Sequence, residues 1–254
     1  MENKENIIQD NKNLLREFLL QKDDDTTYQI PLWKRIALFF ISLFSLFVFP
    51  FIAVFFVLGV PEATRPDALN FICYAFMVAA MFSIIVVDIP KYIPKLVNYK
   101  NYIIGFLCGA LIIFFDIVYI NLVSLHPMYA TGGNETDVRA SIVAFPALSI
   151  VFLGILGPIC EELAYRAGVY KSLSKANKLL AYFVSALIFA FLHFRWNNPN
   201  MIAEWLNFPS YFISGVILAY AYEHGSIVGS CTAHITNNLF SIIMSLTLTG
   251  VIHA

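Results

Sequence analysis

The chain has few charged residues for its length. Asp, Glu, Lys and Arg together make up 13% of its 254 residues, whereas soluble domains typically have about 25%. Hydrophobic residues reach 59%, and the mean hydropathy is +0.72. This composition excludes an ordinary soluble domain and indicates a protein embedded in a membrane. Since the net charge is -1 and the sequence has no basic cluster, we expect no nucleic-acid partner.

Signals for disulfides and for a cleaved leader are also missing. The four cysteines are far apart in the sequence, and each of them lies inside an apolar run. Such spacing does not suit a disulfide framework, so we expect these cysteines to serve packing. The first 35 residues carry thirteen of the 33 charged side chains, and the first long apolar run begins at Ile36. We therefore expect no short cleavable signal peptide and a retained N-terminus.

Long apolar runs dominate the rest of the chain. A helix needs about 20 residues to cross the hydrocarbon core of a bilayer. The runs that reach or approach this length cover residues 36–60, 69–88, 102–125, 141–170, 179–194, 205–222 and 227–248. The fifth and sixth runs are short, so the pattern predicts about seven spans, with six to eight as the range. We expect an all-α, polytopic membrane bundle.

The distribution of Lys and Arg predicts the orientation of this bundle. Six of them precede the first span, three lie between the second and third spans, and three lie in residues 171–178. The alternate loops hold one arginine each. By the positive-inside rule, the N-terminus and the lysine-rich loops are cytoplasmic. The abundance of Asn, Lys, Ile and Phe suggests an AT-rich bacterial genome, so we expect an integral protein of a bacterial cell membrane.

Three charged residues interrupt the fourth apolar run. The stretch "ICEELAYRAGVY", residues 159–170, places Glu161, Glu162 and Arg166 directly after an uncharged segment. In a continuous helix Glu161 lies about 15 Å from Lys171, which is inside the bilayer. Each ionised group there costs about 2.5–3.5 kcal/mol, so these side chains must face protein or water. Glu162 and Arg166 are four residues apart and can pair on one helix face.

Later helices supply further polar groups. His193 ends the fifth run one turn after Phe189, and His234 and Asn238 share a face of the seventh run. A carboxylate and an imidazole can hold and deprotonate a water molecule. A second imidazole and a carboxamide can donate hydrogen bonds to the oxyanion that forms when water attacks an amide. This inventory is typical of peptide hydrolysis.

The three motifs Glu161-Glu162-x-x-x-Arg166, Phe189-x-x-x-His193 and His234-x-x-x-Asn238, in this order on successive apolar segments, resemble those of the CAAX-protease and bacteriocin-processing (CPBP, or Abi) intramembrane proteases. The resemblance implies a helical bundle with a cavity open to the cytoplasm. It implies that Glu161, with His193, activates water, that His234 and Asn238 stabilise the oxyanion, and that the remaining motif residues support this geometry.

The same resemblance suggests a division of the chain and a class of substrate. Residues 1–35 form a polar segment, either an interfacial helix or a cytosolic tail, residues 36–140 the N-terminal spans, and residues 141–250 the catalytic core. The substrate would be a peptide or a protein C-terminus in contact with membrane lipid. In a bacterium, peptide maturation, bacteriocin self-immunity or signalling are the expected roles.

Metal dependence and catalysis itself stay open at this point. Glu161, His193 and His234 form a possible zinc ligand set, but the chain has no H-E-x-x-H helix, and the resemblance favours direct glutamate catalysis. The alternative to an enzyme is a membrane regulator or immunity protein of the same fold that binds a membrane partner. Asp116, a further intramembrane acid, belongs to no motif. A transporter is disfavoured because no inverted repeat is visible.

Overall fold

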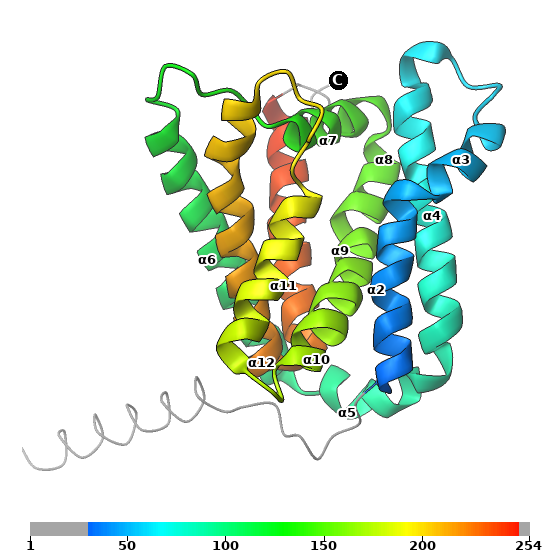
Figure 1. Ribbon diagram of the computed structural model, residues 1–254, viewed down its shortest axis with the longest axis vertical. Helices are drawn as coiled ribbons and strands as arrows, with labels where there is room; N and C mark the ends of the chain where they lie inside the picture. The colour runs from blue at the N-terminus through cyan, green and yellow to red at the C-terminus, as the bar shows by residue number, and fades with distance from the viewer. Residues whose placement is uncertain (1–29, 249–254) are drawn as a thin grey trace, which may run out of the picture.

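The computed structural model describes residues 30–248, and every regular element within them is a helix (Figure 1). The predicted all-α fold is confirmed. The interfacial helix expected within residues 1–35 falls almost entirely on residues 1–29, which lie outside the described residues.

The first predicted span is a bent helix. α2 (Leu32–Phe47) is followed by α3 (Phe49–Ala53) and the 3-10 turn η1 (Val54–Phe56), and the two parts meet at an angle of 52°. Pro50 stands in the first turn of α3. Because proline has no N–H to continue the hydrogen-bond ladder of α2, the helix breaks at this point.

Two longer apolar helices follow. The second predicted span consists of η2 (Glu62–Thr64), α4 (Arg65–Ile85), η3 (Val86–Tyr92) and α5 (Ile93–Leu96). The third is α6 (Tyr99–Val123), which begins after Asn98, whose side chain accepts a hydrogen bond from the Lys100 N–H at 3.1 Å. The short helix α7 (Gly133–Ala144) then lies across the end of the bundle that is opposite to α5 (Figure 1).

The helix that carries Glu161 is continuous over Pro146–Leu173, but it is only partly α-helical. It consists of α8 (Pro146–Leu148), the π-helix η4 (Ser149–Leu156), α9 (Gly157–Glu162), the π-helix η5 (Leu163–Tyr170) and α10 (Lys171–Leu173). Pro158 cannot donate a backbone hydrogen bond, which is one reason for the irregular ladder beside it. π-helical turns are frequent at functional sites. Here they flank the short α segment that ends with Glu161 and Glu162.

The last two helices complete the bundle. α11 (Lys178–Leu192) is capped by Asn177, which accepts from the Leu180 N–H at 2.9 Å. α12 (Met201–Leu248) changes direction at Ser226, where φ is 59° and ψ is -172°. A positive φ is uncommon for residues other than glycine. The chain reverses at Ser226, and the two halves of α12 run in opposite directions (Figure 1). The break predicted between residues 222 and 227 is found here.

Close backbone contacts join α6 to the second half of α12. A side chain at Gly105 would place its Cβ 2.6 Å from the Gly229 carbonyl oxygen, and one at Gly109 would place it 2.9 Å from the Ala233 carbonyl oxygen. Small residues let membrane helices approach in this way. The helix that carries His234 is therefore fixed against α6.

Within residues 30–248, length and composition identify four helices that can cross a membrane, or five if the bent pair at the start counts as one span. The predicted count of seven is therefore not confirmed by this criterion. It is compatible with the structure, because α12 reverses at Ser226 and α11 is a shorter apolar helix. Large apolar side chains such as Phe51, Phe55 and Phe114 are 66–76% exposed, as expected for a surface that faces lipid.

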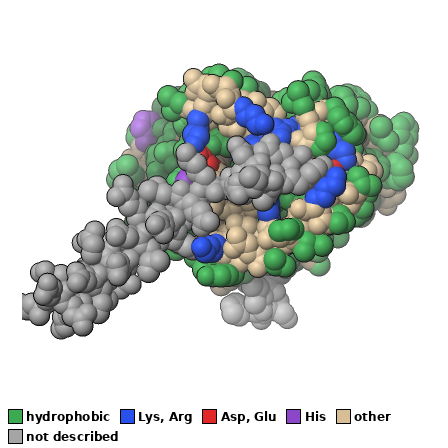
Figure 2. All heavy atoms as spheres, turned by 90° about the horizontal axis from the view of Figure 1, so that it is seen from below, with side chains coloured by type: hydrophobic (Ala, Val, Ile, Leu, Met, Phe, Trp, Pro, Cys, Tyr) green, Lys and Arg blue, Asp and Glu red, His purple; other side chains and the backbone are tan. Residues whose placement is uncertain are grey.

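The two ends of the bundle differ in charge. We call the end at which α2 begins and α5 and α10 lie the lysine end, and the opposite end the α7 end (Figure 1). Eight of the twelve Lys and Arg within residues 30–248 lie at the lysine end: Lys34, Arg35, Lys91, Lys95, Lys100, Lys171, Lys175 and Lys178. Figure 2 looks onto this end and shows Lys and Arg side chains spread over it. The α7 end has three arginines, Arg65, Arg139 and Arg195.

Candidate active site

The centre of the site is a buried ion pair with an imidazole attached to it. Glu162 Oε1 accepts a hydrogen bond from Arg166 at 3.0 Å and another from His234 Nδ1 at 2.9 Å. The side chains of Glu162 and Arg166 are 0% exposed. Arg166 also donates to the Gly215 carbonyl oxygen at 3.0 Å. The structure thus brings together the fourth predicted span and the last one, as the motifs predict.

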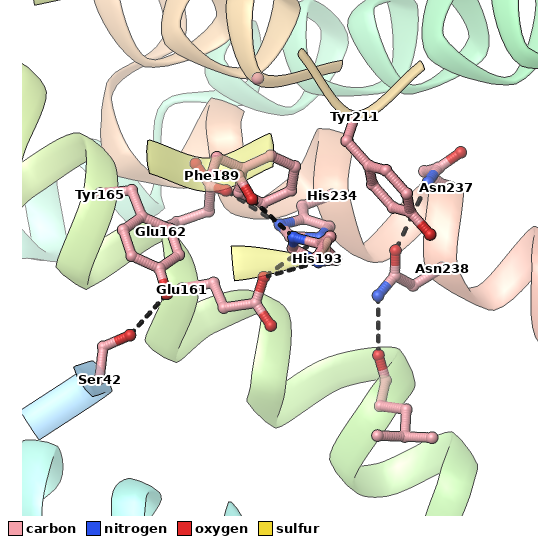
Figure 3. A network of polar contacts seen from close by, with 12 residues as sticks. Ser42, Glu161, Glu162, Tyr165, Phe189, His193, Tyr211, His234, Asn237 and Asn238 are labelled. Carbon is pink, nitrogen blue, oxygen red and sulfur yellow. Dashed lines mark hydrogen bonds and ion pairs between the residues drawn. The ribbon is translucent and has the colours of Figure 1, made fainter. Parts of the chain in front are cut away.

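Glu161 lies beside this pair and faces both histidines (Figure 3). Its Oε2 atom is 3.9 Å from His193 Nε2 and 4.0 Å from His234 Nε2. The same oxygen is buried and has no hydrogen-bond partner among the described residues. One bridging water can span either separation while it hydrogen-bonds to both atoms. Three helices therefore direct a carboxylate oxygen and two ring nitrogens toward one small volume.

The hydrogen bonds of the two rings decide which nitrogen faces Glu161. His193 Nδ1 lies 2.8 Å from the Phe189 carbonyl oxygen, and because a carbonyl only accepts, Nδ1 carries the proton. His234 Nδ1 donates to Glu162 in the same way. In each neutral ring, Nε2 is then the acceptor nitrogen, and in each charged ring it is a second donor. Beside a bound water molecule, the neutral ring can accept a hydrogen bond from the water, and the charged ring can donate one to it.

An aromatic wall holds these side chains in place. The Phe189 ring lies 4.7 Å from the Arg166 guanidinium carbon, 4.5 Å from the His193 ring and 5.6 Å from the His234 ring. The Tyr211 ring stacks on His193 at 4.8 Å with an interplanar angle of 23°. Phe189, expected to support the site, touches three of its members. Tyr211 was not predicted, because nothing in the sequence distinguishes it from the other 12 tyrosines.

Asn238 lies near this group but makes different contacts. Its side-chain nitrogen donates to the Leu153 carbonyl oxygen at 2.9 Å, and its oxygen is 3.5 Å from the side-chain nitrogen of Asn237 (Figure 3). In this arrangement one of the two amide protons of Asn238 is donated to the backbone of the Pro146–Leu173 helix. Asn238, the expected second oxyanion donor, therefore lies one helical turn from His234, but its hydrogen bond is directed at Leu153 and not at Glu161.

A cavity of about 120 Å³ leads to Glu161 and His193. Its walls come from the last turns of α2, the first half of α4, the first half of α7 and the residues that end α11. The members with polar side chains are Ser42, Ser45, Asn70, Tyr74, Asn134, Asp137, Glu161, Tyr165, His193 and Arg195. The volume holds several water molecules and is too small for a peptide without movement of its walls.

Two contacts that the sequence did not predict shape this cavity. Tyr165 and Ser42 share a hydrogen bond of 2.6 Å that ties the helix carrying Glu161 to α2. The buried Glu204 carboxylate accepts from the Gly133 N–H at 2.6 Å and from the Arg195 N–H at 3.0 Å. Glu204 thereby fixes the start of α7 against the segment that follows His193. Tyr165 and Glu204 are single polar residues outside the three motifs, so no local sequence pattern predicts their contacts.

The remaining candidates lie outside this group. Asp116 accepts a hydrogen bond from Ser210 at 2.5 Å, at the contact of α6 with α12. Cys160 and Cys231 carry free thiols, as do Cys73 and Cys108. Within residues 30–248, no group of three or more His, Cys, Asp and Glu side chains is arranged to hold a metal ion. The possible ligand set Glu161, His193 and His234 is therefore not arranged as a preformed metal site.

Comparison with known proteins adds independent information. Residues 143–240 match the family described as type II CAAX prenyl endopeptidase Rce1-like. This match confirms the resemblance to the CPBP family that the three motifs indicated, and it supports an intramembrane protease. No solved structure matches the chain.

Similar proteins come from Lactococcus. The UPF0177 protein YvdC of Lactococcus lactis subsp. lactis is 24% identical over 159 residues, which are 62% of this chain and 56% of that protein. The UPF0177 protein YaiH of the same subspecies is 27% identical over 91% of this chain and 98% of its own length. A UPF0177 protein in the abiGi 5' region of Lactococcus lactis subsp. cremoris is 27% identical over 84% and 91%. The relatives are bacterial, and their names state no activity.

Proposed function

We propose, from the match of residues 143–240 to the Rce1-like family, that the chain is an intramembrane endopeptidase of a bacterial cell membrane. One observation carries the proposal: the unpartnered Oε2 atom of Glu161 faces the Nε2 atoms of His193 and His234, both within a single water's reach. A carboxylate without a partner is costly to bury. A site that positions water for attack explains why the carboxylate is there.

In this proposal Glu161 is the general base. A water held between Glu161 Oε2 and His193 Nε2 loses a proton to Glu161 as its oxygen bonds to the carbonyl carbon of the scissile peptide. When the carbon–nitrogen bond breaks, the same proton passes to the leaving amine. General-base catalysis of this kind contributes about 10²–10⁴-fold to the rate.

His234 is the proposed donor to the oxyanion. Its Nδ1 atom is held by Glu162, so its Nε2 atom has a fixed direction. In its protonated state the ring donates from Nε2 as negative charge develops on the carbonyl oxygen. The Asn238 amide has two protons and donates one of them to the Leu153 carbonyl oxygen. Only the other proton is left for an oxyanion, so the geometry supports His234 more strongly than Asn238.

Arg166 and Phe189 are proposed as positioning residues. Arg166 neutralises Glu162, and Phe189 packs between the guanidinium and both imidazoles. Direct catalysis by glutamate is the preferred mechanism. A zinc ion on Glu161, His193 and His234 is the alternative.

The proposed substrate is a peptide or a protein C-terminus that reaches the site from the lipid or from the adjoining surface. Peptide maturation, self-immunity to a bacteriocin and signalling are the proposed roles, and a further membrane protein is the proposed partner. The eight Lys and Arg at the lysine end favour a cytoplasmic N-terminus. Residues 36–140 are the proposed N-terminal spans and residues 141–250 the catalytic core.

The test compares membrane-associated peptides from cells with the wild-type protein, Glu161→Gln and His234→Ala. Both variants should accumulate the same uncut peptides, while Glu135→Gln on the exposed face of α7 should match the wild type. Membrane levels and melting temperatures of each purified variant establish that the proteins are folded. If both site variants retain full function and the wild-type peptide profile, the protein is a non-catalytic regulator of the same fold.

A further inference from the structure

The cavity that leads to Glu161 opens at the α7 end of the bundle. Ser42, Ser45 and Leu46 come from the last turns of α2, which runs toward that end, and the lining residues of α4 come from the half that begins there. Its members at that end include Asp137 on α7 and Arg195 after α11, whose side chains are 60% and 38% exposed. These two form an ion pair at 2.8 Å beside the cavity mouth.

The path from Glu161 to the lysine end is closed. Seven of the eight residues of η5, which leads from the site to that end, are buried. Below them, the buried Tyr170 ring packs edge-on against Tyr182 and Tyr222. Glu223 accepts hydrogen bonds from Tyr170 and Tyr182 at 2.8 Å each and is paired with Lys178. A packed aromatic and polar layer therefore separates the site from the lysine end.

The charges assign the two ends to opposite sides of the membrane. The lysine end has eight Lys and Arg and two acids, Asp88 and Glu223. The α7 end has three arginines and five acids, Glu62, Asp67, Glu135, Asp137 and Glu204. Loops rich in Lys and Arg remain in the cytoplasm during insertion. The α7 end, with the cavity mouth, then faces outward.

We infer that the site receives its substrate from the extracytoplasmic side. The inference rests on the proposed peptidase function and narrows its substrate class to polypeptide segments exposed on the outer surface of the membrane or in its outer leaflet. The expectations of a cytoplasm-facing cavity and of cytoplasmic lysine-rich loops exclude each other in this structure, because the cavity and the lysines lie at opposite ends. The charge asymmetry decides for the outer side.

Single cysteines at the two ends test this inference in intact cells of a bacterium without an outer membrane. The four native cysteines are replaced by alanine, and Asp137→Cys or Lys175→Cys is added. A membrane-impermeant maleimide should label Asp137→Cys in intact cells and Lys175→Cys only after permeabilisation. Asp137 lines the cavity and its ion pair with Arg195 is partly exposed to solvent, so the protein should stay folded without it.

A second measurement does not need the cysteine-free background and therefore still tests the inference if that protein fails to fold. An epitope tag inserted after Leu125, in the exposed turn before α7, should bind antibody on intact cells, and one inserted after Lys175 should not. Labelling or antibody binding with the reverse pattern, or equal at both ends, overturns the inference and leaves the peptidase proposal standing. The expected pattern together with an unchanged peptide profile in Glu161→Gln would instead remove the peptidase and retain the outward opening.

Discussion

Neutralising Glu162 should destabilise the protein far more than neutralising a similar residue on the surface. In Glu162→Gln the Arg166 guanidinium, which is 0% exposed, keeps its charge and loses the carboxylate that lies 3.0 Å from it. Removing one member of a buried pair costs about 3–5 kcal/mol, because the other charge stays buried. We expect a loss of this size in the free energy of unfolding.

The matched control is the pair of Glu135 and Arg139 on α7. It has the same i,i+4 spacing and a distance of 2.7 Å, but its side chains are 37% and 58% exposed. Exposed helix pairs contribute about 0.3–0.5 kcal/mol. Glu135→Gln should therefore cost roughly a tenth of what Glu162→Gln costs in the same detergent.

Unfolding of the purified proteins by denaturant measures both losses. The double variant Glu162→Gln, Arg166→Met should recover much of the stability, since a buried pair is often replaced by apolar groups at little cost. Peptide hydrolysis should stay low in the double variant, because His234 Nδ1 still lacks its carboxylate partner. Equal, small losses for Glu162→Gln and Glu135→Gln would refute the assignment of a buried charge pair at the centre of the site.

Three further predictions concern the scaffold and the chemistry. Gly105→Ala should cost about 1–3 kcal/mol in unfolding free energy through overpacking, because its Cβ would lie 2.5 Å from that of Thr232. In the control Gly59→Ala, the added Cβ has nothing within 4 Å, so no loss from overpacking is expected. Glu204→Ala should lower the melting temperature and increase proteolysis near α7, because the Gly133 and Arg195 N–H groups lose a charged acceptor, at about 1.5–3 kcal/mol per bond. Chelation of divalent metals should leave hydrolysis unchanged, and lost activity that returns with zinc would favour the metal alternative.

The sequence was sufficient for the fold class and for much of the site because burying charge in a membrane is costly. Few charged side chains interrupt the apolar runs, so Glu161, Glu162 and Arg166 stood out, and helical spacing alone predicted the pair at residues 162 and 166. The reversal at Ser226 was also predictable, since two apolar runs flank it. These features depend on local sequence and on a general solvent effect.

Other features depend on how distant segments pack, and the sequence could not predict them. The stacking of Tyr211 on His193 and the clamp of Glu204 on α7 join residues far apart in the chain. The hydrogen bond from the Asn238 amide to the Leu153 carbonyl oxygen results from the approach of α12 to the helix that carries Leu153. The end at which the cavity opens depends on how the last turns of α2 and the first halves of α4 and α7 are placed around Glu161. Helical periodicity contains no information on any of these contacts.

The most direct measurement of the central claim is hydrolysis by purified protein in liposomes, with a peptide identified from the Glu161→Gln cells as substrate. Wild type and Glu135→Gln should cleave it at similar rates, and Glu161→Gln should be slower by about 10²–10⁴-fold while its melting temperature stays close to that of the wild type. Cleavage by folded Glu161→Gln at the wild-type rate would contradict the assignment of Glu161 as the base.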